Sequence, residues 1–303
     1  MTKVSISIIG LSGLLGPPVL EAINSGLFDN KIKFPVKALS RKHQTSTEKV
    51  EYIQTELTND VIPFIVESLT GVDVIIELVT PIPTLLNTLE QIVEKVAPKI
   101  YIPSQFGVDI GQVATYSPGF LSNKSKHANA IKNPNVKTID VVTSLFAHEG
   151  SFLYEYVGLV GINTEDKTIV QRGSPSTKFS ITKVRDIGFS LVSIATLPVE
   201  TIPTPFRISS DIITYQDVID RYEASHNVKL STVKTLTKEE TLQELNSNFT
   251  KDFNFTDSDF TMDKFVLYVN DIIAQGFNKG ADFTNIHNEL INPKESLWKW
   301  SKY

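Results

Sequence analysis

The stretch VSISIIGLSGLLGPPVLE, residues 4–21, predicts the fold of the amino-terminal half. A run of β-branched residues leads into Gly10, Gly13 and Gly16, and two prolines follow, which a helix tolerates in its first turn. Glycines allow a tight turn and a close approach of the backbone to a pyrophosphate, while unpaired N–H groups at a helix start attract the anion. The stretch therefore predicts a strand, a dinucleotide-binding loop and a helix, which Gly26 ends as a carboxyl-terminal cap.

The composition favours a soluble α/β enzyme. The 303 residues carry 29 Lys and Arg against 34 Asp and Glu, a net charge of −5 without a long basic run, so no nucleic-acid partner is expected. The chain has no cysteine, and its five histidines lack the spacing of ligands, so no metal site is expected. No apolar run approaches the ~18 residues of a membrane helix, and the first strand leaves no room for a signal peptide. We expect a cytoplasmic protein without a membrane partner.

Apolar strands alternate with helical segments in the first half, which is typical of a doubly wound parallel sheet. The expected strands are residues 4–9, 34–39, a short one near Tyr52, 72–79, 99–103 and 136–143; the expected helices include residues 58–69, 84–96 and 121–131. We predict a Rossmann domain over residues 1–152. Residues 153–303, with a strand at 168–172 and a helix opening at Arg185, are expected to complete part of the sheet and to form a smaller α+β substrate lobe.

The end of the second strand indicates which dinucleotide is bound. A ribose 2′-hydroxyl is usually held by an acidic residue there, whereas a 2′-phosphate needs a base. The sequence ALSRKHQ places Arg41 and Lys42 after the strand, and no acidic residue ends it. A charge-assisted pair contributes roughly 1.5–3 kcal/mol, about a 10- to 100-fold preference. We therefore expect NADPH or NADP as the cofactor; the alternative is a solvated pair of loop cations.

Five segments together resemble the NmrA-like, atypical short-chain dehydrogenases, particularly the isoflavone reductase and phenylcoumaran benzylic ether reductase group and its stress-induced fungal relatives. IIGLSGLLG corresponds to the first loop of that group, LSRK to its 2′-phosphate segment, and YIPSQFGVD to its PSEFG signature. FLSNKSKHANAI corresponds to its lysine-bearing helix and ITKVRDIG to its VRDIG segment. The resemblance covers residues 4–195 and fades beyond residue 200, so it implies a reductase but no particular substrate.

The resemblance also implies a set of cofactor contacts. They are Gly10, Ser12, Gly13, Leu14, Leu15 and Gly16 for the pyrophosphate, Arg41 and Lys42 for the 2′-phosphate, and Thr80, Pro81, Gln105, Phe106, Lys124 and Phe146 for the rest of the dinucleotide. Ordinary core packing is the alternative for the apolar members. The group usually has Glu where this chain has Gln105, so a role that needs that carboxylate is not expected.

Lys124 is the expected catalytic residue. In the resembling reductases a lysine here holds the nicotinamide ribose and acts as general acid or base, and an apolar or cationic neighbour lowers the pKa of an amine toward neutrality. The alternative is a surface lysine, with Lys126 and His127 as the nearest rivals. Many short-chain dehydrogenases have a tyrosine four residues before the lysine, but Phe120 occupies that position here. Carbonyl reduction by a Tyr–Lys pair is therefore not expected.

Two functions remain open from the sequence. The first is an NADPH-dependent reductase that transfers a hydride to a small aromatic or conjugated substrate, which Lys124 and the PSQFG segment favour. The second is a redox sensor that binds NADP(H) and regulates a protein partner without turnover, which Gln105 and Phe120 favour. His148 is a further candidate for the substrate pocket, with a structural role as the alternative.

Overall fold

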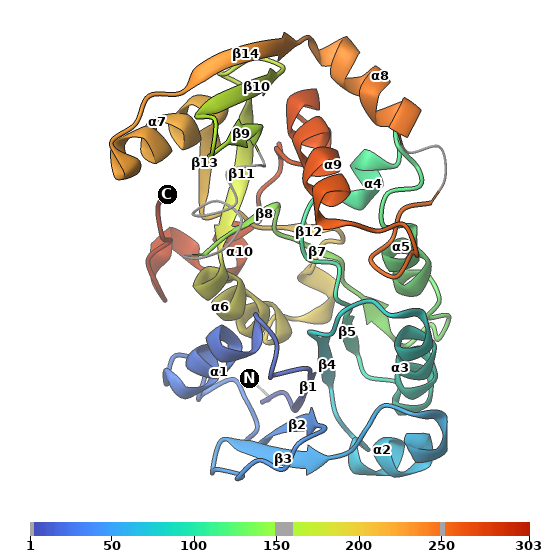
Figure 1. The fold of residues 1–303 in the computed structure, drawn as a ribbon. Coiled ribbons are helices and arrows are strands. Elements are labelled where there is room, and N and C mark those ends of the chain that lie inside the picture. Colours follow the sequence, from blue (N-terminus) through green and yellow to red (C-terminus); the bar gives the residue numbers. More distant parts are fainter. Residues whose placement is uncertain (1–2, 149–159, 249–251) are drawn as a thin grey trace.

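Six parallel strands form the central sheet of the amino-terminal half, in the order β3-β2-β1-β4-β5-β6 (Figure 1). The computed structural model describes residues 3–148, 160–248 and 252–303. The strands are β1 Ile6–Ile9, β2 Val36–Ser40, β3 Val50–Gln54, β4 Val74–Glu77, β5 Ile100–Ile102 and β6 Lys137–Thr138. The chain starts in the middle of the sheet and reverses its direction of travel after β3, which is the Rossmann arrangement. The predicted doubly wound parallel sheet is confirmed.

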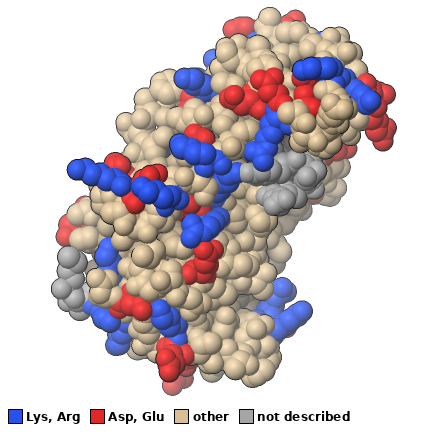
Figure 2. Space-filling view, turned by 90° about the vertical axis from the view of Figure 1, so that its left-hand side faces the viewer, with Lys and Arg blue, Asp and Glu red and all other residues tan. Residues whose placement is uncertain are grey.

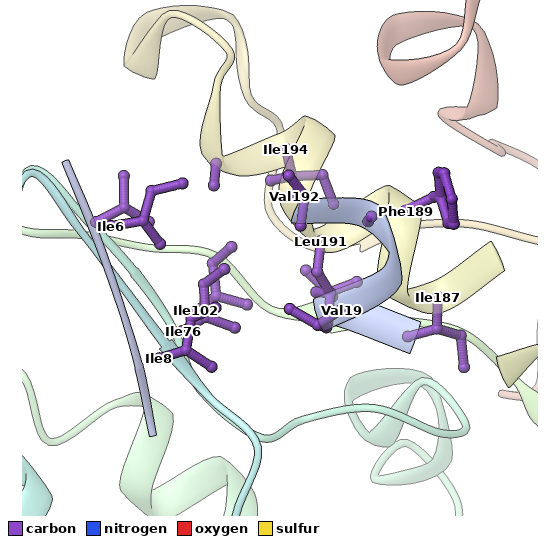
Figure 3. Packing of buried hydrophobic residues seen from close by; sticks show 14 of the residues in the cluster. Ile6, Ile8, Val19, Ile76, Ile102, Ile187, Phe189, Leu191, Val192 and Ile194 are labelled. Carbon is purple, nitrogen blue, oxygen red and sulfur yellow. The ribbon is translucent and has the colours of Figure 1, made fainter. Parts of the chain in front are cut away.

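Helices cover both faces of this sheet, and the strands are apolar on both sides for that reason. On one face, α1 Gly16–Asn24 packs beside α6 Val184–Ala195; on the other lie α2 Ile62–Ser68, α3 Pro83–Val96 and α5 Ser122–Ala128. Figure 3 shows the first of these layers, where Ile8 and Ile76 of the sheet lie opposite Val19 of α1 and Leu191 of α6. The core therefore includes residues far apart in sequence.

The VRDIG segment is a packing element. A Cβ atom on Gly188 would lie 2.4 Å from the carbonyl carbon of Pro18, so α6 approaches α1 more closely than a side chain allows. The buried carboxylate of Asp186 accepts hydrogen bonds from the Ser210 hydroxyl at 2.7 Å and from the backbone N–H of Ser301 at 2.9 Å. This segment thus fastens the carboxyl-terminal part of the chain to the Rossmann helix that follows the glycine loop.

The remaining strands form smaller sheets, which lie above the Rossmann part in Figure 1. β7 Val141–Val142 pairs with β12 Phe206–Arg207, and β8 Leu145–Ala147, β11 Lys178–Lys183 and β13 Asp211–Thr214 form a second set. The third set comprises β9 Ile162–Asn163, β10 Thr168–Arg172 and β14 Ser231–Leu236, and the accompanying helices are α4 Ile110–Val113, α7 Tyr215–His226, α8 Lys238–Asn248, α9 Met262–Gln275 and α10 Asn288–Ile291. The predicted domain boundary between residues 152 and 153 lies outside the described residues.

Several predicted elements are shorter than expected. The predicted strand 136–143 is divided into β6 and β7, because the backbone N–H of Asp140 donates to the Thr204 hydroxyl at 3.2 Å instead of continuing the ladder. The predicted helix 58–69 begins with a 3₁₀ turn at Asn59–Val61 before α2, and the predicted helix 121–131 ends at Ala128. The predicted strand 168–172 agrees with β10.

The described surface is of mixed charge. On the face shown in Figure 2, Lys and Arg side chains are interspersed with Asp and Glu. Within residues 3–148, 160–248 and 252–303, no helix combines the length and the apolar character needed to cross a bilayer. The same residues contain no cluster of three His, Asp or Glu side chains that could hold a metal ion.

Candidate dinucleotide site

The loop between β1 and α1 has two positions that only glycine can occupy. Gly10 has a φ of +102°, and a Cβ atom there would lie 2.9 Å from the carbonyl carbon of Leu78. A Cβ atom on Gly16 would lie 1.7 Å from the carbonyl oxygen of Leu11. The N–H of Gly13 donates to the Gly10 carbonyl at 3.1 Å, which closes the turn. These glycines are therefore required by the fold of the loop itself.

The helix start differs from the expectation in one respect. Pro17 and Pro18 occupy its first turn and supply no N–H groups, and the N–H of Gly16 is used internally. An anion would therefore be bound by backbone N–H groups of the loop, where Ser12 and Leu14 are exposed, more than by the helix end. As predicted, α1 ends just before Gly26, which has a φ of +83°.

A cavity of about 640 Å³ lies beside the glycine loop at the carboxyl ends of the strands. Five predicted cofactor contacts line it: Gly10, Ser12, Gly13, Arg41 and Thr80. The other lining residues are Ile9, Leu39, Ser40, Thr55, Glu56, Leu57, Thr58, Asn59, Leu78, Val79, Ile82, Thr84, Leu85 and Thr88. The cavity spans the point where the strand order reverses, between β1 and β4, which is where ligands bind in open α/β sheets.

Arg41 lines this cavity and directly follows β2. Its side chain is exposed, and its guanidinium group donates no hydrogen bond to any of the described residues. Lys42 is also exposed but does not line the cavity, and its carbonyl oxygen accepts a hydrogen bond from the Ser40 hydroxyl at 2.8 Å. The loop thus offers one unengaged guanidinium to an anionic ligand in the cavity.

Lys124 is buried, and the alternative of a surface lysine is wrong for it. Lys124 is 7% exposed, and its Nζ donates a hydrogen bond to the carbonyl oxygen of Phe106 at 2.9 Å. Burial lowers the pKa of the amine to about 8, although the nearby Glu77 carboxylate acts in the opposite direction. The exposed lysine of this helix is Lys126, which pairs with Asp252 at 2.8 Å.

Gln105 ties the loop after β5 to α5. Its buried side-chain amide donates to the backbone carbonyl oxygen of Lys124. An ionised glutamate has no proton to donate and could not make this bond. Leu14, Leu15, Gly16, Lys42, Pro81, Gln105, Phe106, Lys124 and Phe146 are the predicted contacts that do not line the cavity. Five of the fourteen predicted contacts therefore line one cavity, and hydrogen bonds join Gln105 and Phe106 to Lys124 outside it.

Phe120 does not share a helix with Lys124. Leu121 has a left-handed backbone with a φ of +47°, and α5 begins only at Ser122. The Phe120 ring packs against Tyr268, with ring centroids 4.6 Å apart. Residue 120 therefore does not lie one helical turn before the lysine, because the chain turns between them and Phe120 packs in the carboxyl-terminal core. His148 is exposed, and residues 149–159 after it lie outside the described ranges.

A buried cluster of titratable groups lies behind Lys124, and the sequence reasoning missed it. His127 of α5 lies between two carboxylates: its Nε2 is 2.9 Å from Oε2 of Glu77, and its Nδ1 is 2.8 Å from Oε1 of Glu90. The Tyr101 hydroxyl donates to Oε2 of Glu77 and lies 2.7 Å from His127 Nε2. The signal in the sequence was Glu77 itself, an acidic residue at the end of the apolar run VDVIIE.

This chain is similar to known proteins in its three-dimensional structure. No protein-family model matches the sequence, and no curated protein matches it. The fold is similar to that of pinoresinol-lariciresinol and phenylcoumaran benzylic ether reductases, with a TM-score of 0.69 at 18% identity, covering 97% of this chain and 96% of that chain. The chain has the fold of these reductases.

Two further solved structures agree with this result. The leucoanthocyanidin reductase of Vitis vinifera, solved as a binary complex with NADPH, has a TM-score of 0.65 at 16% identity over 96% of this chain and 95% of that chain. An isoflavone reductase has a TM-score of 0.64 at 18% identity over 89% of this chain and 87% of that chain. At these identities the comparison establishes the fold, which is the fold that the sequence resemblance implied.

Proposed function

We propose that the protein is an NADPH-dependent reductase that transfers a hydride to a small aromatic or conjugated substrate. The observation that carries the proposal is the buried Lys124, an amine whose pKa is lowered to about 8 at the carboxyl edge of a Rossmann sheet. A group with this pKa exchanges protons efficiently near neutral pH. The solved reductases with this fold include one in complex with NADPH, which supports the same cofactor here.

The residues of the cavity fit a dinucleotide with a 2′-phosphate. The glycine loop leaves exposed backbone at Ser12 and Gly13 for a pyrophosphate, and Arg41 offers a guanidinium that no carboxylate engages among the described residues. Thr80, which lies three residues after β4, borders the same cavity. Lys42, outside the cavity, would add to the positive potential without a fixed contact. When bound, the nicotinamide would supply the hydride.

Lys124 then supplies the proton that reduction of a conjugated bond requires. The ammonium form donates the proton to the substrate atom that becomes negative as the hydride arrives, and the resulting neutral amine is tolerated because it is buried. Phe106 and the half-buried Phe146 are the apolar groups proposed to border the nicotinamide and the substrate. A Tyr–Lys mechanism for simple carbonyls is not part of the proposal, since Phe120 is packed in the carboxyl-terminal core.

One observation favours the second function, a sensor that binds NADP(H) and acts on a protein partner without turnover. The cavity is lined by the residues expected around the adenosine half, whereas Gln105, Phe106 and Lys124 do not line it. A formed cavity therefore supports nucleotide binding. The two functions share the cofactor and differ only in turnover.

The experiment that separates them combines calorimetry with a substrate screen. Binding of NADPH and NADH is measured on the purified protein, and NADPH oxidation is followed anaerobically with enones, quinones and phenylpropanoid ethers. Oxidation with any of these classes supports the reductase. Tight binding of NADPH without oxidation contradicts the reductase and favours the sensor, and absence of binding contradicts both.

A further inference from the structure

The cluster behind Lys124 contains more ionisable groups than packing requires. Glu77 and Tyr101 are fully buried, and His127 is 3% exposed. Burying charges is costly unless they are paired, and groups with perturbed pKa values gather at sites where a proton is held or moved. Each of these residues projects from a different element: β4, β5 and α5.

His127 has two different neighbours on its two ring nitrogens. Nε2 faces inward to Glu77 and Nδ1 faces outward to Glu90, whose side chain is 26% exposed on α3. The two carboxylates raise the pKa of His127, in opposition to its burial. An imidazole between two carboxylates can accept a proton on one nitrogen and release one from the other. Glu90 does not line the cofactor cavity, so it reaches solvent by a separate path.

Glu77 connects the cluster electrostatically with Lys124. Its Oε2 is engaged by Tyr101 and His127, whereas its Oε1 is buried and has no hydrogen-bond partner among the described residues. Lys124 lies three residues before His127 on α5, which places the two side chains on one face of the helix. The Glu77 charge also acts on the Lys124 amine. The unengaged oxygen therefore belongs to a carboxylate that contacts His127 and acts electrostatically on Lys124.

We propose that Glu90, His127 and Glu77 form a proton relay that recharges Lys124 from solvent, with Tyr101 holding Glu77 in position. The inference rests on the proposed reductase, in which each turnover consumes one proton at Lys124, a residue that is buried from solvent. A relay that opens at α3 supplies this proton without release of cofactor or substrate.

The transfers balance without any change of oxidation state. Glu90 takes a proton from water and passes it to Nδ1, a proton leaves Nε2 for Oε2 of Glu77, and the Glu77 carboxyl group delivers a proton to the neutral amine of Lys124. Only N–H and O–H bonds form and break, and the net result is one proton moved from solvent to Nζ. Because Nζ donates to Phe106 in this structure, the last step requires a rotation of the carboxyl group or one bridging water.

The test uses Glu90→Gln, which keeps an oxygen acceptor for Nδ1 but cannot carry a proton. Because Glu90 is partly exposed, the variant is expected to fold, and circular dichroism checks its secondary structure. The matched control is Glu94→Gln, one turn along the same helix, where the carboxylate accepts from the backbone N–H of Asn133 at 3.2 Å and does not contact His127. The relay predicts that Glu90→Gln lowers kcat by about tenfold, which is less than the usual 10²- to 10⁴-fold contribution of a proton-transfer group because water partly substitutes for the carboxylate. The KM for NADPH stays unchanged, and added imidazole restores kcat.

A second measurement does not depend on a substrate. Exchange of the His127 ring N–H protons with water is measured by ¹⁵N NMR in the wild-type protein and both variants, with and without NADP. The relay predicts slower exchange in Glu90→Gln and wild-type exchange in Glu94→Gln. Equal exchange in the two variants overturns the relay, as does an unchanged kcat in Glu90→Gln. If the wild-type protein oxidises no NADPH, the proposed function fails on that result, and the exchange rates still decide whether Glu90 conducts protons to His127.

Discussion

The Lys124 ammonium donates a hydrogen bond at 2.9 Å to the backbone carbonyl oxygen of Phe106. In return, the Gln105 side chain of the same loop donates to the backbone carbonyl of Lys124. Two hydrogen bonds to main-chain carbonyl oxygens therefore connect helix α5 with the loop that follows β5. No hydrogen bond or ion pair joins the amine to a carboxylate among the described residues. A neutral acceptor stabilises the ammonium form less than a carboxylate does, which leaves burial as the main effect on its pKa.

Replacing the amine should abolish turnover and spare the fold. Lys124→Met keeps a long apolar stem in the buried site but removes the proton donor, so we expect a loss of 10²- to 10⁴-fold in kcat, the usual contribution of general acid catalysis. NADPH oxidation and the binding enthalpy of NADPH are measured together. Lys126→Met, on the exposed face of the same helix, is the control and should retain activity. Undiminished turnover in Lys124→Met would remove this residue from the mechanism.

The pH dependence of the reduction should follow the amine. Since the ammonium form is the proton donor, kcat/KM should be constant below the pKa of about 8 and should fall as Lys124 loses its proton above it. The Glu77 carboxylate raises this pKa, so Glu77→Gln should move the alkaline limb to lower pH. A pH profile measured at saturating NADPH checks both statements. An alkaline limb that does not move in Glu77→Gln contradicts the electrostatic link.

Arg41 should determine the preference for NADPH. Its guanidinium borders the cavity, and loss of a charge-assisted bond to the 2′-phosphate costs roughly 1.5–3 kcal/mol. Arg41→Ala is therefore expected to weaken NADPH binding by a factor of about 10 to 100 and to leave NADH binding nearly unchanged. Lys42→Ala, which alters a cation outside the cavity, should have the smaller effect. Calorimetric titration of both variants with both nucleotides is the measurement, and an equal loss for NADPH and NADH refutes the assignment.

The amino-terminal fold was predictable because its signals are local. The backbone is restricted locally at Gly10, at Gly16 and at the two prolines. The order of strand, loop and helix can therefore be predicted from the amino-acid sequence alone. Strand ends were less predictable, since β6 and β7 are separated by a bond from Asp140 to Thr204, a residue far along the chain. Local patterns cannot report such a partner.

In the candidate site, too, features set by local sequence were predictable and features set by distant residues were not. Arg41 was predictable because it follows a strand whose end faces the cavity. The environment of Lys124 was not, since the groups that surround it, Glu77 and Phe106, come from different strands and loops. The partnership of Glu77 with His127 joins residues of β4 and α5, and no periodic pattern marks it. Long-range pairs of this kind become visible only when the sheet is assembled.

The contact between α6 and α1 should be intolerant of a single methyl group. Because a Cβ atom at position 188 would lie 2.4 Å from the Pro18 carbonyl carbon, Gly188→Ala must separate the two helices. Overpacking of this kind costs typically about 1–3 kcal/mol. Urea unfolding measures the loss, and Gly71→Ala serves as the comparison, since an added Cβ there meets no atom within 4 Å although its φ of +75° carries a backbone cost. A Gly188→Ala variant as stable as the wild type contradicts the close packing.

A buried carboxyl group in the carboxyl-terminal part should make stability depend on pH. Asp271 of α9 is fully buried, and neither of its oxygens has a hydrogen-bond partner among the described residues. Its Oδ1 lies 3.3 Å from Nε of Arg172, but Arg172 is shared with Glu244. Burial raises the pKa of Asp271 to about 7, and the Glu244 charge adds to this effect against that of Arg172.

The sign of the effect follows from the two protonation states. Between pH 4 and pH 7 the folded protein keeps the Asp271 proton that the unfolded chain releases, so the free energy of unfolding falls as pH rises through this window and is level above it. Asp271→Asn removes the charge and should abolish this contribution, which amounts to at most about 4 kcal/mol for a pKa shift of this size. The difference between wild-type and variant unfolding free energies, measured in urea at pH 5 and pH 8, isolates Asp271 from the other carboxyl groups. We expect the variant to gain relative stability at pH 8, because the folded wild-type protein must then hold a buried carboxylate; a difference that does not change with pH would show that Asp271 is already ionised at pH 5.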